Sequence, residues 1–137
     1  MGRSDRLPGD TLVGVHVLFV DDDRDSRDLV RMILQYSGAL VTVAASARDA
    51  RRVLKRVTPD VLIVDIAMPR EDGYTFIREV RNLPAERGGH IPAIAVTAER
   101  DAHGPDRTLA AGFQMHLTKP IDGWELCHAV ARGPRSR

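Results

Sequence analysis

The chain has 137 residues, 43% hydrophobic and 28% charged, a length and composition that fit one ordinary globular domain. Its 20 basic and 19 acidic side chains nearly cancel, which excludes binding to nucleic acid or acidic membranes through bulk charge. The single cysteine, Cys127, excludes an internal disulfide, and its apolar helical surroundings predict a small buried thiol. The sequence contains no apolar run of membrane-spanning length and no signal-peptide pattern, so we expect a cytoplasmic protein.

The chain begins with a segment, 1–13, that we expect to be a flexible lead-in because glycine, proline and charged residues dominate it. Residues 15–20 form an apolar, β-branched run that predicts a buried strand. A helix with regularly spaced apolar residues follows and ends near Gly38. A second strand is predicted over 40–44, and Ser46 is expected to cap the helix after it.

The helix after Ser46 combines an apolar stripe with a basic opposite face. The stripe consists of Ala47, Ala50, Val53, Leu54 and Val57. The opposite face consists of Arg48, Arg51, Arg52, Lys55 and Arg56. This basic face could be a docking surface, but the solvated side of an ordinary helix gives the same pattern and is the commoner case.

The remaining elements continue the alternation of strand and helix. Their predicted ranges are strand 61–64, helix 74–83, strand 91–96, helix 106–111, strand 114–117 and helix 122–132, the last capped by Asp122. Five strands, each followed by a helix, predict a doubly wound α/β fold with a five-stranded parallel sheet and helices on both faces. We expect this single domain to cover 14–132 and to leave a frayed tail, 133–137.

Polar side chains follow four of the five predicted strands. In an open parallel sheet, ligands bind outside the carboxyl ends of the strands, so these positions carry the greatest functional interest. The side chains concerned are Asp21, Asp22 and Asp23 after the first strand, Asp65 after the third, Thr97 after the fourth and Lys119 after the fifth.

Several carboxylates at one edge of a sheet repel one another unless a cation lies among them. Oxygen donors without histidine or cysteine favour a hard ion, and few carboxylates favour Mg²⁺ over Ca²⁺. A carboxylate beside Mg²⁺ can act as a nucleophile towards a phosphoryl group, whose charge Lys119 would help to neutralise. Taken singly, each residue also has a structural explanation: Asp23 and Asp72 could cap helices, and Thr97 could simply end a strand.

Four short motifs, in this order along the chain, resemble the receiver domain of two-component response regulators over about residues 14–132. They are Val-Asp-Asp-Asp at 20–23, Asp-Ile-Ala-Met-Pro-Arg-Glu-Asp-Gly at 65–73, Thr-Ala at 97–98 and Thr-Lys-Pro at 118–120. The chain is similar to stand-alone, chemotaxis-regulator-like members, while residues 110–117 are similar to receivers of hybrid kinases. The resemblance implies a flavodoxin-like sheet with strand order 2-1-3-4-5.

The resemblance also implies a function: Mg²⁺-dependent transfer of a phosphoryl group to Asp65 from a histidine kinase or histidine phosphotransfer protein. Asp22 would bind Mg²⁺ directly and Asp21 would support the ion through water. Asp65 and the backbone carbonyl of Ala67 would complete the ligands, whereas Asp23 would cap the first helix. Such a domain is a phosphoacceptor that assists its own phosphorylation and dephosphorylation, not an enzyme for external substrates.

Thr97 and Lys119 would contact the attached phosphoryl group, and the family pattern implies a cis bond between Lys119 and Pro120. The position of the usual aromatic switch residue holds His116, which could turn inward with Thr97 or remain in solvent; both possibilities stay open. Ala67 and Glu99 occupy the positions that flank the path of attacking water. Because only Glu99 could orient a water, we expect an intermediate to slow self-dephosphorylation.

Two further alternatives concern the kind of protein. The chain could be a stand-alone receiver or a receiver module excised from a longer regulator or hybrid kinase; Met1 and a plausible native lead-in favour the first. An aspartate-dependent phosphohydrolase would need a general acid two residues after Asp65, where Ala67 cannot serve. An inactive receiver is disfavoured because every expected charged group is present.

Overall fold

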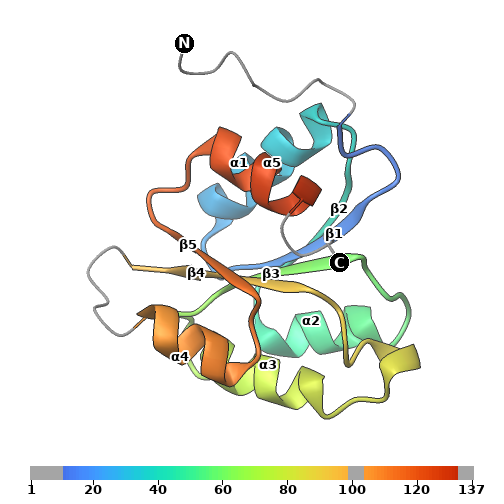
Figure 1. Cartoon of the computed structure of the whole chain (residues 1–137), viewed down its shortest axis with the longest axis vertical. Coiled ribbons are helices and arrows are strands. Elements are labelled where there is room, and N and C mark those ends of the chain that lie inside the picture. Colours follow the sequence, from blue (N-terminus) through green and yellow to red (C-terminus); the bar gives the residue numbers. More distant parts are fainter. Residues whose placement is uncertain (1–10, 99–103, 133–137) are drawn as a thin grey trace.

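The computed structural model describes residues 11–98 and 104–132, which form one sheet between two layers of helices (Figure 1). The strands are β1 (His16–Val20), β2 (Leu40–Ala44), β3 (Val61–Asp65), β4 (Ala93–Thr97) and β5 (Met115–Thr118). The helices are α1 (Arg24–Tyr36), α2 (Ala47–Leu54), α3 (Gly73–Arg81), the 3₁₀ turn η2 (Ala85–Arg87), α4 (Gly104–Ala111) and α5 (Gly123–Arg132). All neighbouring strands are parallel in the order β2-β1-β3-β4-β5, which confirms the predicted fold class and strand order.

The sheet is buried on both faces. Helices α1 and α5 cover one face, and α2, α3 and α4 cover the other (Figure 1). Along β3, Val61 and Ile63 belong to the cluster beneath α1 and α5, whereas Leu62 and Val64 belong to the cluster beneath the other three helices. Because side chains of a strand alternate between faces, burial on both sides explains why β3 is apolar throughout.

Side chains of the first residue before each helix fix where several helices begin. Asp23, Ser46 and Asp72 each accept a hydrogen bond from the backbone N–H three residues later, at 3.0, 3.1 and 2.9 Å. Asp122 accepts two such bonds, at 2.8 and 3.2 Å, from the first turn of α5. These bonds satisfy N–H groups that have no partner within the helix, and they confirm the predicted caps.

Several elements differ from their predicted bounds by one to three residues, and α2 and β4 are two examples. Helix α2 ends at Leu54, and Val57, which was expected in its apolar stripe, is 42% exposed. The chain turns after Leu54 and approaches Pro59, which disfavours helical backbone at the residue before it. Strand β4 begins at Ala93 instead of residue 91, because Pro92 has no N–H to donate to a neighbouring strand.

Leu12 is part of the packed domain although it falls in the predicted flexible lead-in, 1–13. Its side chain is fully buried in the cluster beneath α1 and α5, and its N–H donates to the Ser37 carbonyl at 2.7 Å. The apolar side chain therefore anchors the chain two residues before the predicted start of the domain. Cys127 is buried in the same cluster, as predicted. Among residues 11–98 and 104–132, the structure contains no helix with the length and apolar character needed to cross a membrane.

Arg81, at the end of α3, ties three segments of backbone together. Its guanidinium donates to the carbonyl oxygens of Gly112 (2.9 Å), Gly89 (3.0 Å) and Ile91 (2.8 Å). A fourth bond, at 3.2 Å, reaches the Gln114 side chain. Burial lowers the pKa of Arg81, yet these acceptors satisfy the guanidinium.

Candidate functional site

The predicted polar residues meet at the carboxyl edge of the sheet. Asp21 and Asp22 follow β1, Asp65 ends β3, Thr97 ends β4 and Lys119 follows β5. Asp21, Asp65 and Thr97 are buried, Asp22 is exposed, and the Lys119 side chain lies half-buried at the rim. Because β1, β3, β4 and β5 are adjacent and parallel, their ends bring side chains up to 98 positions apart into one pocket.

Asp65 is held by hydrogen bonds to both carboxylate oxygens. The Ala67 N–H donates to Oδ1 at 3.2 Å, and Lys119 Nζ donates to Oδ2 at 3.2 Å. The residue is only 3% exposed, so the two contacts fix one orientation of the carboxylate at the bottom of the pocket. The predicted cis bond between Lys119 and Pro120 is confirmed.

Asp21 is fully buried and only partly satisfied. The Asp23 N–H donates to its Oδ1 at 2.9 Å, whereas Oδ2 accepts no hydrogen bond from any residue of the described ranges. Lys119 Nζ lies 3.9 Å from that oxygen. Burial raises the pKa of Asp21 to about 6, and repulsion from Asp65 adds to the rise, although the Asp23 N–H and Lys119 oppose it.

The three carboxylates of Asp21, Asp22 and Asp65 fit a hard divalent cation. Each offers an oxygen within 4.8 Å of the others. One ammonium, that of Lys119, faces them; burial lowers its pKa, but attraction to Asp65 and Asp21 outweighs this and raises the pKa overall. The excess of negative charge, the all-oxygen donors and the unpartnered Asp21 Oδ2 are the features that a Mg²⁺ ion would satisfy.

The loop after Asp65 explains the Asp-Gly pair that ends the second motif. A Cβ on Gly73 would lie 3.0 Å from the Asp65 carbonyl oxygen and 2.9 Å from Ile66 Cδ1. Glycine therefore allows α3 to begin directly against the end of β3, where Asp72 caps it. Arg70, midway along the loop, has a left-handed φ of 69°, which shows how sharply the chain turns there.

Two residues beside the acids have structural contacts. Asp23 accepts hydrogen bonds from both the hydroxyl (2.8 Å) and the N–H (3.0 Å) of Ser26, which lower its pKa, so the predicted capping role is confirmed. Arg27 donates to the Asp21 carbonyl at 2.9 Å, a contact that we did not predict. Its position four residues after the cap, one helical turn on, was the signal that could have indicated it.

Three residues, His116, Ala67 and Glu99, lie at positions where the chain departs from the best-known members of the family. His116 is half-buried on β5, in a hollow shared with Trp124 and His128 of α5, whose rings stack 4.5 Å apart. Its role in switching stays a prediction. Ala67 is exposed, and Glu99 falls outside the described residues, so the expected intermediate to slow self-dephosphorylation also stays a prediction.

Fold and site together define a small α/β domain with an acidic pocket for a cation and a fixed carboxylate. The family model of the response regulator receiver domain matches residues 17–131. The chain therefore belongs to the receiver domains of two-component response regulators. An uncharacterised 14.6 kDa protein from the sodA1 3′ region of Leptolyngbya boryana is 45% identical over 120 residues, which cover 88% of this chain and 90% of that protein.

Two further relatives represent longer proteins. The Regulator of RpoS from Escherichia coli K12 is 34% identical over 110 residues, which cover 80% of this chain but only 32% of the regulator. The receiver domain of the sensor histidine kinase PA1611 from Pseudomonas aeruginosa PAO1 is 31% identical, with a TM-score of 0.80 over 90% of this chain and 100% of that one. In that structure a magnesium ion is coordinated in the active site cleft.

Proposed function

We propose that this receiver domain accepts a phosphoryl group on Asp65, in a Mg²⁺-dependent reaction with the phosphohistidine of a histidine kinase or histidine phosphotransfer protein. The proposal rests on a difference between two neighbouring buried carboxylates in the hydrogen bonds that they accept. Asp65 has both oxygens fixed by Ala67 and Lys119, while Asp21 keeps a buried oxygen without a hydrogen bond from the described residues. The first arrangement suits a positioned nucleophile and the second suits a cation ligand.

The residues that would hold the Mg²⁺ ion are Asp21, Asp22, Asp65 and the backbone carbonyl of Ala67. The cluster geometry of the three acids and the magnesium in the Pseudomonas relative support this set. When bound, the ion supplies positive charge that offsets repulsion between the carboxylates and the phosphoryl oxygens.

In the transfer, an Asp65 carboxylate oxygen forms a bond to phosphorus as the bond between phosphorus and the donor's imidazole nitrogen breaks. The imidazole nitrogen keeps the electron pair, so no further reactant is needed. Lys119, now 3.2 Å from Asp65 Oδ2, would pair with a phosphoryl oxygen, and the Thr97 hydroxyl would donate a hydrogen bond to another. Ala67 provides no general acid, so the domain acts as a phosphoacceptor and not as an enzyme for external substrates.

The donor would approach along α1. An apolar hollow lined by Leu29, Pro120 and Ile121 adjoins Lys119 at the rim of the acidic pocket, and Leu29 is 48% exposed. A docked partner would cover this surface and bring its phosphohistidine to Asp65. Because phosphohistidine donors draw on ATP, we place the reaction in the cytoplasm.

Thr97 and His116 would form the switch. They lie on the adjacent strands β4 and β5, where Thr97 pairs with Thr118, so His116 is two residues from the partner of Thr97 and on the same face of β5. A Thr97 side chain drawn towards the phosphoryl group would leave space into which the half-buried His116 ring can turn.

The test is incubation with acetyl phosphate, with and without Mg²⁺, followed by intact mass measurement. We expect one phosphoryl addition that requires Mg²⁺ and is absent from Asp65→Asn. Asp23→Asn is the matched control, because it removes the same charge from the cap beside the pocket and should still be modified. Addition that persists in Asp65→Asn would overturn the assignment of the phosphoacceptor.

A further inference from the structure

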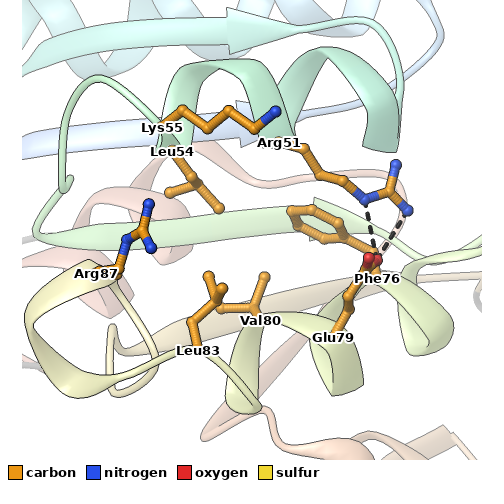
Figure 2. A pocket seen from close by; sticks show the side chains of 8 residues that line it. All are labelled: Arg51, Leu54, Lys55, Phe76, Glu79, Val80, Leu83 and Arg87. Carbon is orange, nitrogen blue, oxygen red and sulfur yellow. Dashed lines mark hydrogen bonds and ion pairs between the residues drawn. The ribbon is translucent and has the colours of Figure 1, made fainter.

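A groove lies between α2 and α3, on the face of the sheet opposite α1 and α5 (Figures 1 and 2). Its apolar lining is formed by Phe76 and Val80 at the floor and by Leu54 and Leu83 at the sides. Phe76 and Val80 are buried in the core, while Leu54 and Leu83 are half-buried along the sides. With a volume of about 180 Å³, the groove offers room for a large apolar side chain.

One end of the groove is closed by an internal ion network. Arg51 of α2 donates to Glu79 of α3 at 2.8 and 3.0 Å and also binds Glu71 in the loop that follows Asp65. These hydrogen bonds raise the pKa of Arg51 and leave both carboxylates engaged. One guanidinium between two carboxylates leaves this end of the groove with one negative charge in excess.

Two further cations, Lys55 after α2 and Arg87 in η2, line the groove and are exposed. The Lys55 side chain lies along the α2 side and extends towards Arg51, whereas Arg87 lies at the end away from Arg51 and Glu79 (Figure 2). Within residues 11–98 and 104–132, neither Lys55 nor Arg87 forms an ion pair with a carboxylate. Two free cations thus flank an apolar cavity, an arrangement that complements an apolar side chain next to acidic ones.

The surroundings extend this positive character. Arg48 and Arg52 are exposed on α2, and Arg56 is exposed just after it. Arg52 lies 3.5 Å from Asp49, and among the described residues neither Arg48 nor Arg56 forms an ion pair. The chain as a whole carries only +1, so this concentration of charge is local. A merely solvated helix face would border polar surface, whereas this one borders a recessed apolar groove.

We propose that the α2–α3 groove binds an acidic, amphipathic segment of a partner protein. A large apolar side chain of that segment lies in the groove between Leu54 and Leu83, and carboxylates on either side of it pair with Lys55 and Arg87. A lipid surface fits less well, because the apolar residues are recessed instead of protruding. Nucleic acid fits less well too, because its phosphates would leave the apolar floor uncovered.

The test is selection of binders to the full chain from a random peptide library displayed on phage, followed by titration of the enriched peptides with the ¹⁵N-labelled protein. We expect the enriched sequences to combine Asp or Glu with Leu, Ile or Phe, and to shift the amide signals of Leu54 and Leu83. Lys55→Glu with Arg87→Glu should weaken binding by about tenfold or more. Arg48→Glu with Arg56→Glu is the matched control, because it makes the same charge change on and just after α2, outside the groove lining, and should weaken binding far less.

Three results would overturn the proposal. Enrichment without acidic residues, or no enrichment at all, would show that the groove does not select this chemistry. Equal losses of peptide affinity in the two double variants would show that overall charge, and not the groove, determines binding. Binding to duplex DNA or phosphatidylglycerol vesicles that depends on Lys55 and Arg87, with no peptide bound there, would assign the surface to a different class of partner. Because both double variants keep Asp65 and its pocket, phosphorylation with acetyl phosphate serves as a separate check that they fold.

Discussion

Arg81 is half-buried and Asp21 is fully buried, and the hydrogen bonds available to these two charged side chains differ sharply. Arg81 donates four hydrogen bonds to oxygens of Gly112, Gly89, Ile91 and Gln114. Asp21 has one oxygen bonded to the Asp23 N–H and another without a hydrogen bond from the described residues. The charge of Arg81 is therefore compensated by acceptors within the protein, whereas the charge of Asp21 needs a ligand to compensate it fully.

This difference separates a structural charge from a functional one. A buried charge with complete partners holds segments together, because breaking its bonds exposes several buried acceptors at once. A buried charge with an open position costs stability unless a ligand completes it. By this criterion the end of α3 has a structural role, and the carboxyl edge of the sheet has the features expected of a cation site.

The largest effect is expected from Arg81→Ala. The change removes all four hydrogen bonds and leaves buried carbonyl oxygens without partners, so the free energy of unfolding should fall by about 3 kcal/mol. Urea denaturation measures this fall. Arg78→Ala, an exposed position on the same helix, is the control and should change stability by less than about 0.5 kcal/mol. Equal stabilities of the two variants would show that the Arg81 hydrogen bonds do not stabilise the fold.

A smaller but still clear loss is expected from Gly73→Ala. The added Cβ would meet the Asp65 carbonyl oxygen at 3.0 Å, so the end of β3 or the start of α3 must move, at a cost of about 2 kcal/mol. Phosphoryl uptake should fall as well, because Asp65 is displaced. Gly123→Ala is the control: its Cβ would lie 3.5 Å from Ile33, an ordinary contact, and both stability and uptake should stay close to those of the unchanged chain.

The pKa of Asp21 predicts a pH dependence of both stability and metal binding. The folded state keeps the proton to about pH 6, whereas the unfolded state releases it near 3.8, so the folded state binds more protons between these values. The free energy of unfolding contributed by Asp21 therefore falls as pH rises from about 4 to about 6 in the absence of metal. Because Mg²⁺ must displace this proton, its affinity should drop by up to about tenfold per pH unit below 6. Calorimetric titration at several pH values measures the affinity, and a constant affinity between pH 5 and 8 would contradict the shift.

The fold was largely predictable from the sequence because its strands are buried on both faces and end abruptly. The all-apolar run that ends at Asp65 predicts a buried strand without any knowledge of the neighbouring strands. The errors lay in the bounds of elements, as at β4, where Pro92 acts on the backbone and leaves the hydrophobic pattern unchanged. Leu12 was missed because burial of one side chain in a polar segment depends on the helices that cover it.

The site residues could be predicted because parallel strands place their carboxyl ends together, so Asp21, Asp65 and Lys119 needed only the order of elements. The hydrogen bonds that these side chains make could not be predicted, because they depend on which atoms come within hydrogen-bond distance in the folded chain. The same holds for Arg51: the basic pattern of α2 does not show that one of its arginines turns towards Glu71 and Glu79. The spacing of residues predicts which face of a helix they occupy. The partners of a long side chain depend on which groups lie near it in the folded chain.

The most direct measurement is the stability of Asp21→Asn with and without Mg²⁺. If the buried charge serves a cation, the metal-free variant should be more stable than the unchanged chain by about 1 kcal/mol, because asparagine removes an incompletely matched charge. Mg²⁺ should then stabilise the unchanged chain but have little effect on the variant. A variant that is less stable than the unchanged chain, and that Mg²⁺ still stabilises to the same extent, would contradict the assignment of Asp21 to a cation site.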